Sequence, residues 1–307
     1  MNHPIAEVSV LILARNEAEN VGPCLSAVCS QECKRPREVI LLDSGSTDGT
    51  LDIARRFPVR IEQIPPHTFH HARTRNYAAS LARGEYLVYL AADACPVANT
   101  WLESLLQPFG DPAVAAVYGR HLPKGEATAE RRTTLAAVYG EERIIKDKSK
   151  KRDLGYRCYH LSTVNAALRR AAWSATKFPE DVKVFEDIAI GKRLIDAGWK
   201  IVYEPHAAVY HSHNHTSDAL LKRYFDLGVT WRRLGMWDAA VRASLVRDAL
   251  RLVSGGNHRR PNGSQPSSHY SSFGPTAVKY LGISLGLNER LLPLRIKKKL
   301  SAFQLFD

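Results

Sequence analysis

The chain has 307 residues, 45% of them hydrophobic and 24% charged, a length and composition that allow one large soluble α/β domain with an appendage. No apolar run approaches the roughly 18–20 residues of a membrane span, and Met1–Ala6 does not have the features of a signal peptide. The net charge is +12. The five cysteines are odd in number and form no Cys-x-x-Cys pair, and this favours a reduced, cytoplasmic protein.

The first predicted element is a buried strand over Val8–Ala14, followed by a turn and a helix with apolar residues at Val21, Leu25 and Val28. Asn16 and Glu17 lie in the turn between strand and helix. Residue type alone favours a capping role for them over contact with a nucleotide base and ribose.

Two further predicted strands end at a carboxylate. Arg37–Asp43 is an apolar run that stops at Asp43 and turns into a helix, and the run that begins at Tyr86 stops at Asp93. The carboxyl ends of parallel strands share one edge of a sheet, where α/β proteins hold ligands. A carboxylate there needs a cation, an arginine or backbone N–H groups. We interpret Asp93 as a ligand of a divalent metal that holds a diphosphate; the alternative is an N-cap of the next helix.

Two groups of polar residues follow in the second half of the chain. Glu186 and Asp187 open a predicted amphipathic helix over Phe185–Gly198, where acids are also favourable for the helix dipole by about 0.3–1 kcal/mol. Four histidines, at positions 206, 211, 213 and 215, lie within ten residues of one another. A single histidine is more often a core or surface residue than a metal ligand, so residue type alone does not assign these four a role.

The motifs resemble those of inverting family 2 glycosyltransferases with a GT-A fold. Val8–Glu17 is similar to the first strand and turn of that family, and Asp43–Thr50 reads D-S-G-S-T-D-G-T where many members have D-D-G-S-T-D-G-T. Ala91 stands where the first acid of the family's Asp-x-Asp motif is expected, so only Asp93 remains.

The resemblance implies a fold and its divisions. We expect an α/β structure with a Rossmann-like, mostly parallel sheet flanked by helices. Residues 1–216 would form the catalytic domain, with a nucleotide-sugar half at about 1–123 and an acceptor half at 124–216. Residues 217–307 would form a basic, helical C-terminal region with a flexible segment near 254–272.

The resemblance also implies roles for particular residues. It makes Asp187 the general base, with Glu186 and Asn165 on the acceptor side. It makes Asp93 and His211 the ligands of Mg²⁺ or Mn²⁺, with His213 as second choice. Arg75 is favoured over Arg73 beside the nucleotide. The predicted nucleotide-sugar residues are Ala14, Asn16, Glu17, Asp43, Arg75, Ala92 and Asp93.

A narrower likeness covers Thr68–Pro123, which resembles bacterial rhamnosyltransferases of O-antigen and polysaccharide synthesis. These commonly read T-Q-D-A where this chain has Ala91–Ala94, so a single acid is familiar there. The likeness implies transfer from dTDP-rhamnose to a glycan or lipid-linked acceptor and leaves a UDP-sugar donor open. The missing first acid prompts an alternative, a catalytically degenerate sugar-nucleotide-binding or scaffold subunit.

The remaining segments are rich in charge. We predict a loop over the acceptor cleft at Glu126–Arg152, helices at Leu220–Arg233 and Ala240–Val253, and a flexible linker at Ser254–Ser272. From position 218 onward there are 15 Lys and Arg against 6 Asp and Glu, so +9 of the net charge lies there.

This asymmetry indicates an anionic partner. Leu291–Leu300 is a short basic amphipathic stretch, which is typical either of a docking helix with a solvated face or of contact with an anionic membrane. We favour the inner face of the cytoplasmic membrane. A nucleic-acid binder is a third possibility that depends on charge alone, since no nucleic-acid motif is present.

Overall fold

The computed structural model describes residues 6–239, 241–246 and 273–306. The predicted linker at 254–272 and most of the predicted helix at 240–253 lie outside the described residues. The strands are β1 (Val8–Ala14), β2 (Arg37–Asp43), β3 (Arg60–Gln63), β4 (Tyr86–Ala91), β5 (Cys95–Pro96), β6 (Val114–Leu122), β7 (Ile144–Lys146), β8 (Asn165–Arg169) and β9 (Lys200–Tyr210). The helices are α1 (Ala18–Cys29), α2 (Thr50–Ala54), α3 (His71–Leu81), α4 (Trp101–Leu106), α5 (Ala129–Val138), α6 (Lys151–Leu154), α7 (Arg170–Thr176), α8 (Glu186–Asp196), α9 (Ser217–Arg233), α11 (Phe273–Leu287) and α12 (Leu294–Leu300).

One sheet runs through the described part of the chain, in the order β3-β2-β1-β4-β8-β6-β9-β5, with β7 added against β9. The strands β1, β2, β3, β4, β6 and β9 run in one direction, and β5, β7 and β8 run against it. The predicted α/β class with a mostly parallel sheet is confirmed.

Alternating side chains of the central strands enter two separate cores, one on each face of the sheet. On one face Val10 and Ile12 of β1 pack with residues of α1 and α4. On the other face Leu11 packs with residues of α3, α7 and α8. A strand that is buried on both faces reads as a continuous apolar run, and this explains the sequence of β1.

The strand register places the carboxyl ends of β1, β2 and β4 side by side. Ala14 of β1 pairs with Asp43 of β2, and Leu13 pairs with Ala91 of β4. Asp43 and Asp93 therefore lie at the same edge of the sheet, as the sequence predicted.

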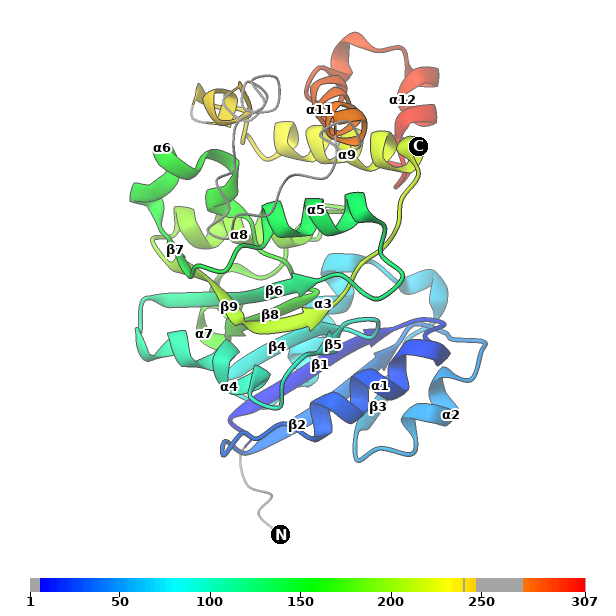
Figure 1. Cartoon of the computed structure of the whole chain (residues 1–307), viewed down its shortest axis with the longest axis vertical. Coiled ribbons are helices and arrows are strands. Elements are labelled where there is room, and N and C mark those ends of the chain that lie inside the picture. The colour runs from blue at the N-terminus through cyan, green and yellow to red at the C-terminus, as the bar shows by residue number, and fades with distance from the viewer. Residues whose placement is uncertain (1–5, 240, 247–272, 307) are drawn as a thin grey trace.

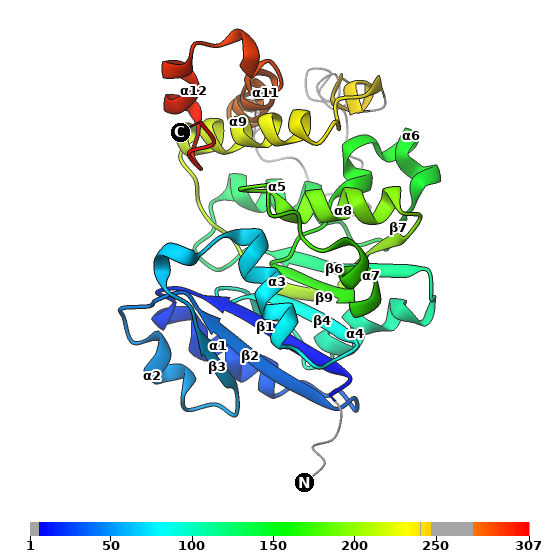
Figure 2. The same ribbon diagram turned by 180° about the vertical axis from the view of Figure 1, so that it is seen from behind.

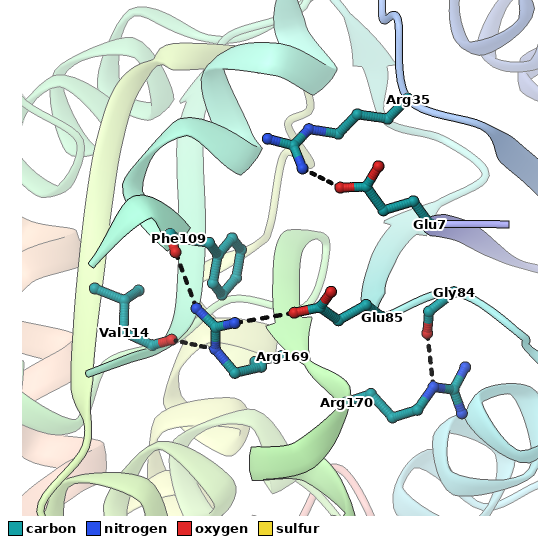
Figure 3. Close-up of polar contacts among 8 residues, drawn as sticks. All are labelled: Glu7, Arg35, Gly84, Glu85, Phe109, Val114, Arg169 and Arg170. Carbon is teal, nitrogen blue, oxygen red and sulfur yellow. Dashed lines mark hydrogen bonds and ion pairs between the residues drawn. The ribbon is translucent and has the colours of Figure 1, made fainter. Parts of the chain in front are cut away.

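At the opposite edge of the sheet, where β4 and β6 begin, ion pairs and hydrogen bonds join neighbouring segments (Figure 3). Arg169 donates to the carbonyl oxygens of Phe109 and Val114 at 3.0 and 3.2 Å and forms an ion pair with Glu85 at 3.1 Å. Arg170 donates to the carbonyl oxygen of Gly84 at 2.6 Å. These arginine groups have protein partners, so this edge serves the fold.

The prediction that Glu126–Arg152 is a loop is wrong. The segment contains α5, β7 and the start of α6. Thr128 caps α5 by accepting a hydrogen bond from the backbone N–H of Arg131, and Leu135 is buried. Most of the charged side chains of the segment are exposed or half-buried, with Lys146 a buried exception, and their number masked the short amphipathic pattern.

The C-terminal helices lie together at one end of the molecule, and α5 and α8 lie between them and the sheet (Figures 1 and 2). α9 and α11 pack so closely that the contact requires glycine at position 286. A Cβ atom on Gly286 would lie only 2.1 Å from the carbonyl oxygen of Phe225. Among the described residues, none of the helices has both the length and the apolar composition needed to cross a bilayer.

Candidate functional site

The turns after β1 and β2 are tied to each other. The backbone N–H of Asn16 donates to Ser46 Oγ at 2.8 Å, and Asn16 Oδ1 accepts from the N–H of Thr47 at 2.8 Å. Asn16 has a φ of 54°, a left-handed conformation that asparagine tolerates better than most residues. Its side chain therefore holds the two turns together.

Asp43 is fully buried at the end of β2, and its own turn uses its carboxylate. It accepts hydrogen bonds from the N–H groups of Gly45 and Ser46, each at 3.0 Å, and from the Ser46 hydroxyl. Gly45 has a φ of 82°, and a Cβ there would lie 2.2 Å from Pro66, so the turn requires glycine. The predicted contact between Asp43 and a nucleobase stays a prediction.

A hydrogen-bonded chain crosses from α1 to the segment after β6. Glu17 does not cap α1 with its side chain; its Oε2 accepts from Asn20 Nδ2 at 2.8 Å. Asn20 Oδ1 in turn accepts from the Lys124 amine at 3.0 Å. Asn20, Lys124 and Asp93 line one open groove with a volume of about 530 Å³. Sequence analysis missed Lys124, because a single lysine after a strand carries no signal.

Three side chains of residue types that commonly ligate metals converge on the edge where β4 and β9 end. The ligand atoms of Asp93, His211 and His213 all lie within 4.8 Å of one another. Asp93 Oδ2 is 3.4 Å from Nε2 of His211 and 3.0 Å from Nε2 of His213. The structure brings together the predicted pair of ligands and the second choice as well.

The charges of this cluster suit a cation. Burial alone would raise the pKa of Asp93, but the hydrogen bonds from His211 and His213 outweigh it and hold the pKa below its usual range. Burial lowers the pKa of His211, which favours the neutral imidazole that binds metals. One carboxylate and two imidazoles form a donor set that fits Mn²⁺, whereas Mg²⁺ prefers oxygen ligands.

Asp187 lies in the first turn of α8, beside Glu186. Glu186 is 4% exposed and forms an ion pair of 2.7 Å with Arg75 of α3. Burial and the negative charge of Glu186 raise the pKa of Asp187, and Arg75 partly opposes this. A carboxyl group with a raised pKa is suited to accept a proton near neutral pH.

The residue before this pair has an unusual backbone. Phe185 is the N-cap of α8 and has φ 62° and ψ 32°, the left-handed conformation. A bulky residue in this region is an outlier and carries strain on the order of 1–3 kcal/mol. Nothing in the amino-acid sequence signals this conformation.

Aromatic rings link the surroundings of Asp187 to the cluster of Asp93, His211 and His213. The charge of Asp187 acts on Tyr139, whose pKa is raised mainly by burial. The Tyr139 ring stacks on His121 with centroids 4.3 Å apart, and His121 meets the His211 ring edge-on at 5.3 Å. Sequence analysis missed Tyr139 and His121, which lie far along the chain from both motifs.

The other predicted residues have different surroundings. Asn165 is wholly buried: it accepts from the Trp101 indole at 2.9 Å and donates to the carbonyl oxygen of Ala207 at 2.8 Å. The structure therefore does not bring Asn165 to the site, because both polar groups of its side chain already serve the core. Ala14 and Ala92 are buried at the strand ends, where Ala14 accepts hydrogen bonds from Ser44. Arg75 contacts Glu186, and its predicted contact with a nucleotide stays a prediction.

Known proteins are similar to this chain in sequence. The family model described as glycosyl transferase family 2 matches residues 9–175. The chain is 39% identical over 201 residues to the O-antigen chain rhamnosyltransferase WbaN of Salmonella anatum, covering 65% of this chain and 64% of that one, just under two thirds of its length. It is 32% identical over 222 residues to RfbN of Salmonella typhimurium, also named an O-antigen chain rhamnosyltransferase, covering 71% of each chain.

Solved structures agree on the fold. A mannosyltransferase from Pyrobaculum calidifontis, solved in complex with GDP-Man and Mn²⁺, is similar with a TM-score of 0.62 and 18% identity. The match covers 92% of this chain and 88% of that one, and it supports the GT-A fold. The sequence matches and the fold agree, and the chain belongs to glycosyl transferase family 2.

Proposed function

We propose that the protein transfers a sugar from a nucleotide-diphosphate donor to a hydroxyl group, with inversion at the anomeric carbon. The observation that carries this proposal is the convergence of Asp93, His211 and His213 at the carboxyl edge of the sheet. Family membership and the raised pKa of Asp187 support it.

Asp93, His211 and His213 are the residues that would hold a divalent cation. When bound, such a cation neutralises the negative charge that develops on a leaving diphosphate. The solved mannosyltransferase complex with GDP-Man and Mn²⁺ supports this assignment, since it has the same fold. Lys124, which lines the same groove as Asp93, supplies a further positive charge.

Asp187 is the proposed general base. A sugar hydroxyl is a weak nucleophile, so Asp187 accepts its proton while the new oxygen–carbon bond forms and the bond to the diphosphate breaks. The attack comes from the side opposite the leaving group, so the configuration inverts in one step. No covalent bond to the protein is needed.

The names of the relatives support a rhamnose donor. Two of them are called O-antigen chain rhamnosyltransferases. We propose dTDP-rhamnose as the first donor to test, a UDP-sugar as the second, and a glycan or lipid-linked saccharide of polysaccharide synthesis as acceptor.

A mass-spectrometric screen tests the proposal. Purified protein is incubated with Mn²⁺, one donor and a set of lipid-linked acceptors, and a mass increase of one sugar in the acceptor is expected. Nucleotide binding without transfer or donor hydrolysis with any pair would favour the alternative of a degenerate binding subunit, which the loss of the first acid at Ala91 prompts.

Removing Arg75 is expected to shift the pH dependence of transfer. Arg75 lowers the pKa of Asp187, so this pKa should rise in Arg75→Met. The base acts as a carboxylate, and activity is lost as pH falls through its pKa. The acid limb of the kcat profile should therefore move to higher pH. Arg73→Met, an exposed arginine of the same helix, should leave the limb in place. An acid limb unchanged in both variants would contradict the assignment of Asp187.

We also propose contact with an anionic membrane through α12. Leu291, Leu294 and Ile296 are exposed by 82%, 55% and 43%, and Arg295, Lys298 and Lys299 are exposed beside them. The five cysteines are free, which fits a reducing compartment and so the inner membrane face.

Neutralising α12 should weaken binding to vesicles. Each cation near an anionic leaflet contributes about 1 kcal/mol, so Arg295→Gln/Lys298→Gln/Lys299→Gln should lower the partition coefficient by about two orders of magnitude. The control is Arg55→Gln/Arg56→Gln/Arg60→Gln, which removes the same charge near α2, at the other end of the molecule (Figure 1). Equal cosedimentation of both variants with phosphatidylglycerol vesicles would rule α12 out as the contact.

A further inference from the structure

The segment before α8 is held by residues from the C-terminal part of the chain. The Phe185 ring lies 5.4 Å from the guanidinium of Arg223 on α9. It meets the ring of Phe303 edge-on at 6.2 Å, and Arg223 also lies 5.8 Å from that ring. Phe185 thus contacts two side chains that are far from it in sequence, Arg223 and Phe303.

The segment that carries Phe303, Ser301–Phe306, is here called the tail. It is anchored to α9 by Asp226, a wholly buried carboxylate that accepts a hydrogen bond from the N–H of Phe303 at 2.9 Å. Within the tail, the N–H of Leu305 donates to the Ser301 hydroxyl at 3.0 Å. The tail is therefore a built structure with a fixed position on α9.

The tail also contacts the segment before α8 directly. The Lys183 amine donates to the carbonyl oxygen of Gln304 at 2.9 Å. Val184 shares a small core with Phe225, Val229 and Leu305. Lys183 and Val184, the two residues before Phe185, are consequently held against α9 and the tail.

The left-handed conformation of Phe185 needs such support. Without side-chain contacts a phenylalanine leaves this region for the ordinary helical or extended one, and strained residues persist only where the surroundings hold them. Because Phe185 is the N-cap of α8, its backbone angles set where the first turn of the helix, with Asp187, points.

We propose that Phe303, the residue of the tail that contacts Phe185, is a positioning residue for sugar transfer: together with Arg223 it holds Phe185 in the conformation that aims Asp187 at the acceptor hydroxyl. This inference rests on the proposed role of Asp187 as general base. It gives the C-terminal region a part in the reaction that is separate from any membrane contact of α12.

The test compares two phenylalanines of the tail. Phe303→Ala removes the ring that contacts Phe185, whereas Phe306→Ala removes a ring that packs on Phe225 and beneath Arg233. Phe303→Ala should lower kcat about tenfold. This is the loss expected if only about a tenth of the molecules keep Phe185 in the left-handed conformation. Its donor KM and its affinity for nucleotide with Mn²⁺ should stay within twofold of wild type. Phe306→Ala should keep kcat within twofold.

A readout that does not need turnover separates this inference from the proposed function. The N–H groups of Ile188 and Ala189 donate to Asp187 Oδ1 and to the carbonyl oxygen of Phe185, and their hydrogen–deuterium exchange should become faster in Phe303→Ala and not in Phe306→Ala. Arg223→Met should likewise speed up this exchange. It provides a second test of the same contact if Phe303→Ala folds poorly. A change in exchange without any effect on kcat would overturn the inference while leaving Asp187 as base. A fully active Asp187→Asn would instead overturn the proposed function.

A double-mutant cycle tests whether Phe303 acts through Phe185. Glycine adopts a φ of 62° at little cost, so Phe185→Gly removes the need for the support. In the Phe185→Gly background, Phe303→Ala should change kcat by less than about twofold. The same tenfold loss in both backgrounds, or a wild-type kcat for Phe303→Ala alone, would show that the tail does not act through Phe185.

Discussion

Replacing Asp187 by asparagine is expected to lower kcat by about 10³-fold while nucleotide binding stays intact. General-base catalysis contributes roughly 10²–10⁴-fold, and the raised pKa of Asp187 indicates a group tuned for proton transfer near neutral pH. Asparagine keeps the size of the side chain and cannot accept the proton. Because the loss is confined to the chemical step, KM for the donor should change little.

The control for this prediction lies in the same segment of the chain. Asp181 is an exposed carboxylate shortly before α8, and Asp181→Asn should retain wild-type kcat. The measurement is steady-state transfer with the donor found in the screen. An Asp187→Asn variant with more than about one tenth of wild-type kcat would exclude Asp187 as the base.

Replacing Asp93 by alanine should abolish the metal-dependent part of nucleotide affinity. Asp93 is the carboxylate of the predicted ligand set, and loss of even a residue that only supports a metal ligand commonly costs 10–100-fold in metal affinity. Calorimetric titration with dTDP or UDP in the presence of Mn²⁺ should show binding that is at least about 100-fold weaker, and removal of Mn²⁺ should weaken wild-type binding to the same level.

Glu19 offers a matched control for Asp93. It is an exposed acid that lines the same groove, but it is not among the grouped ligand atoms. Glu19→Gln should bind nucleotide as wild type does, with the same response to Mn²⁺. Unchanged affinity in Asp93→Ala would remove this residue from the metal site.

The strands that frame the site were predictable because burial on both faces leaves a plain pattern in the sequence. β1, β2 and β4 are short apolar runs, and the position of an acid at the end of β2 and just beyond β4 follows from the chain itself. The clustering of His211 with Asp93 was inferred through the family resemblance, because residues from β4 and from the segment after β9 meet only when the sheet forms.

Other parts of the site depend on contacts between distant residues and leave no local signal. Arg75 pairs with Glu186, more than a hundred residues further along the chain, so its partner could not be read from either segment. The resemblance placed Asn165 on the acceptor side, yet its side chain is buried and accepts a hydrogen bond from the Trp101 indole, a partner 64 residues away in the chain. The left-handed Phe185 is the clearest case, since its conformation is set by a tail more than a hundred residues away.

We propose that one cation, held at the carboxyl edge of the sheet, fixes the diphosphate of the donor within reach of Asp187. The most direct test is a crystal structure of the protein with Mn²⁺ and dTDP, with data collected at the manganese absorption edge. We predict an anomalous difference peak in contact with Asp93 and His211, with the diphosphate beside it and Asp187 facing the same space. A nucleotide bound elsewhere, or a peak that does not touch Asp93, would contradict the account.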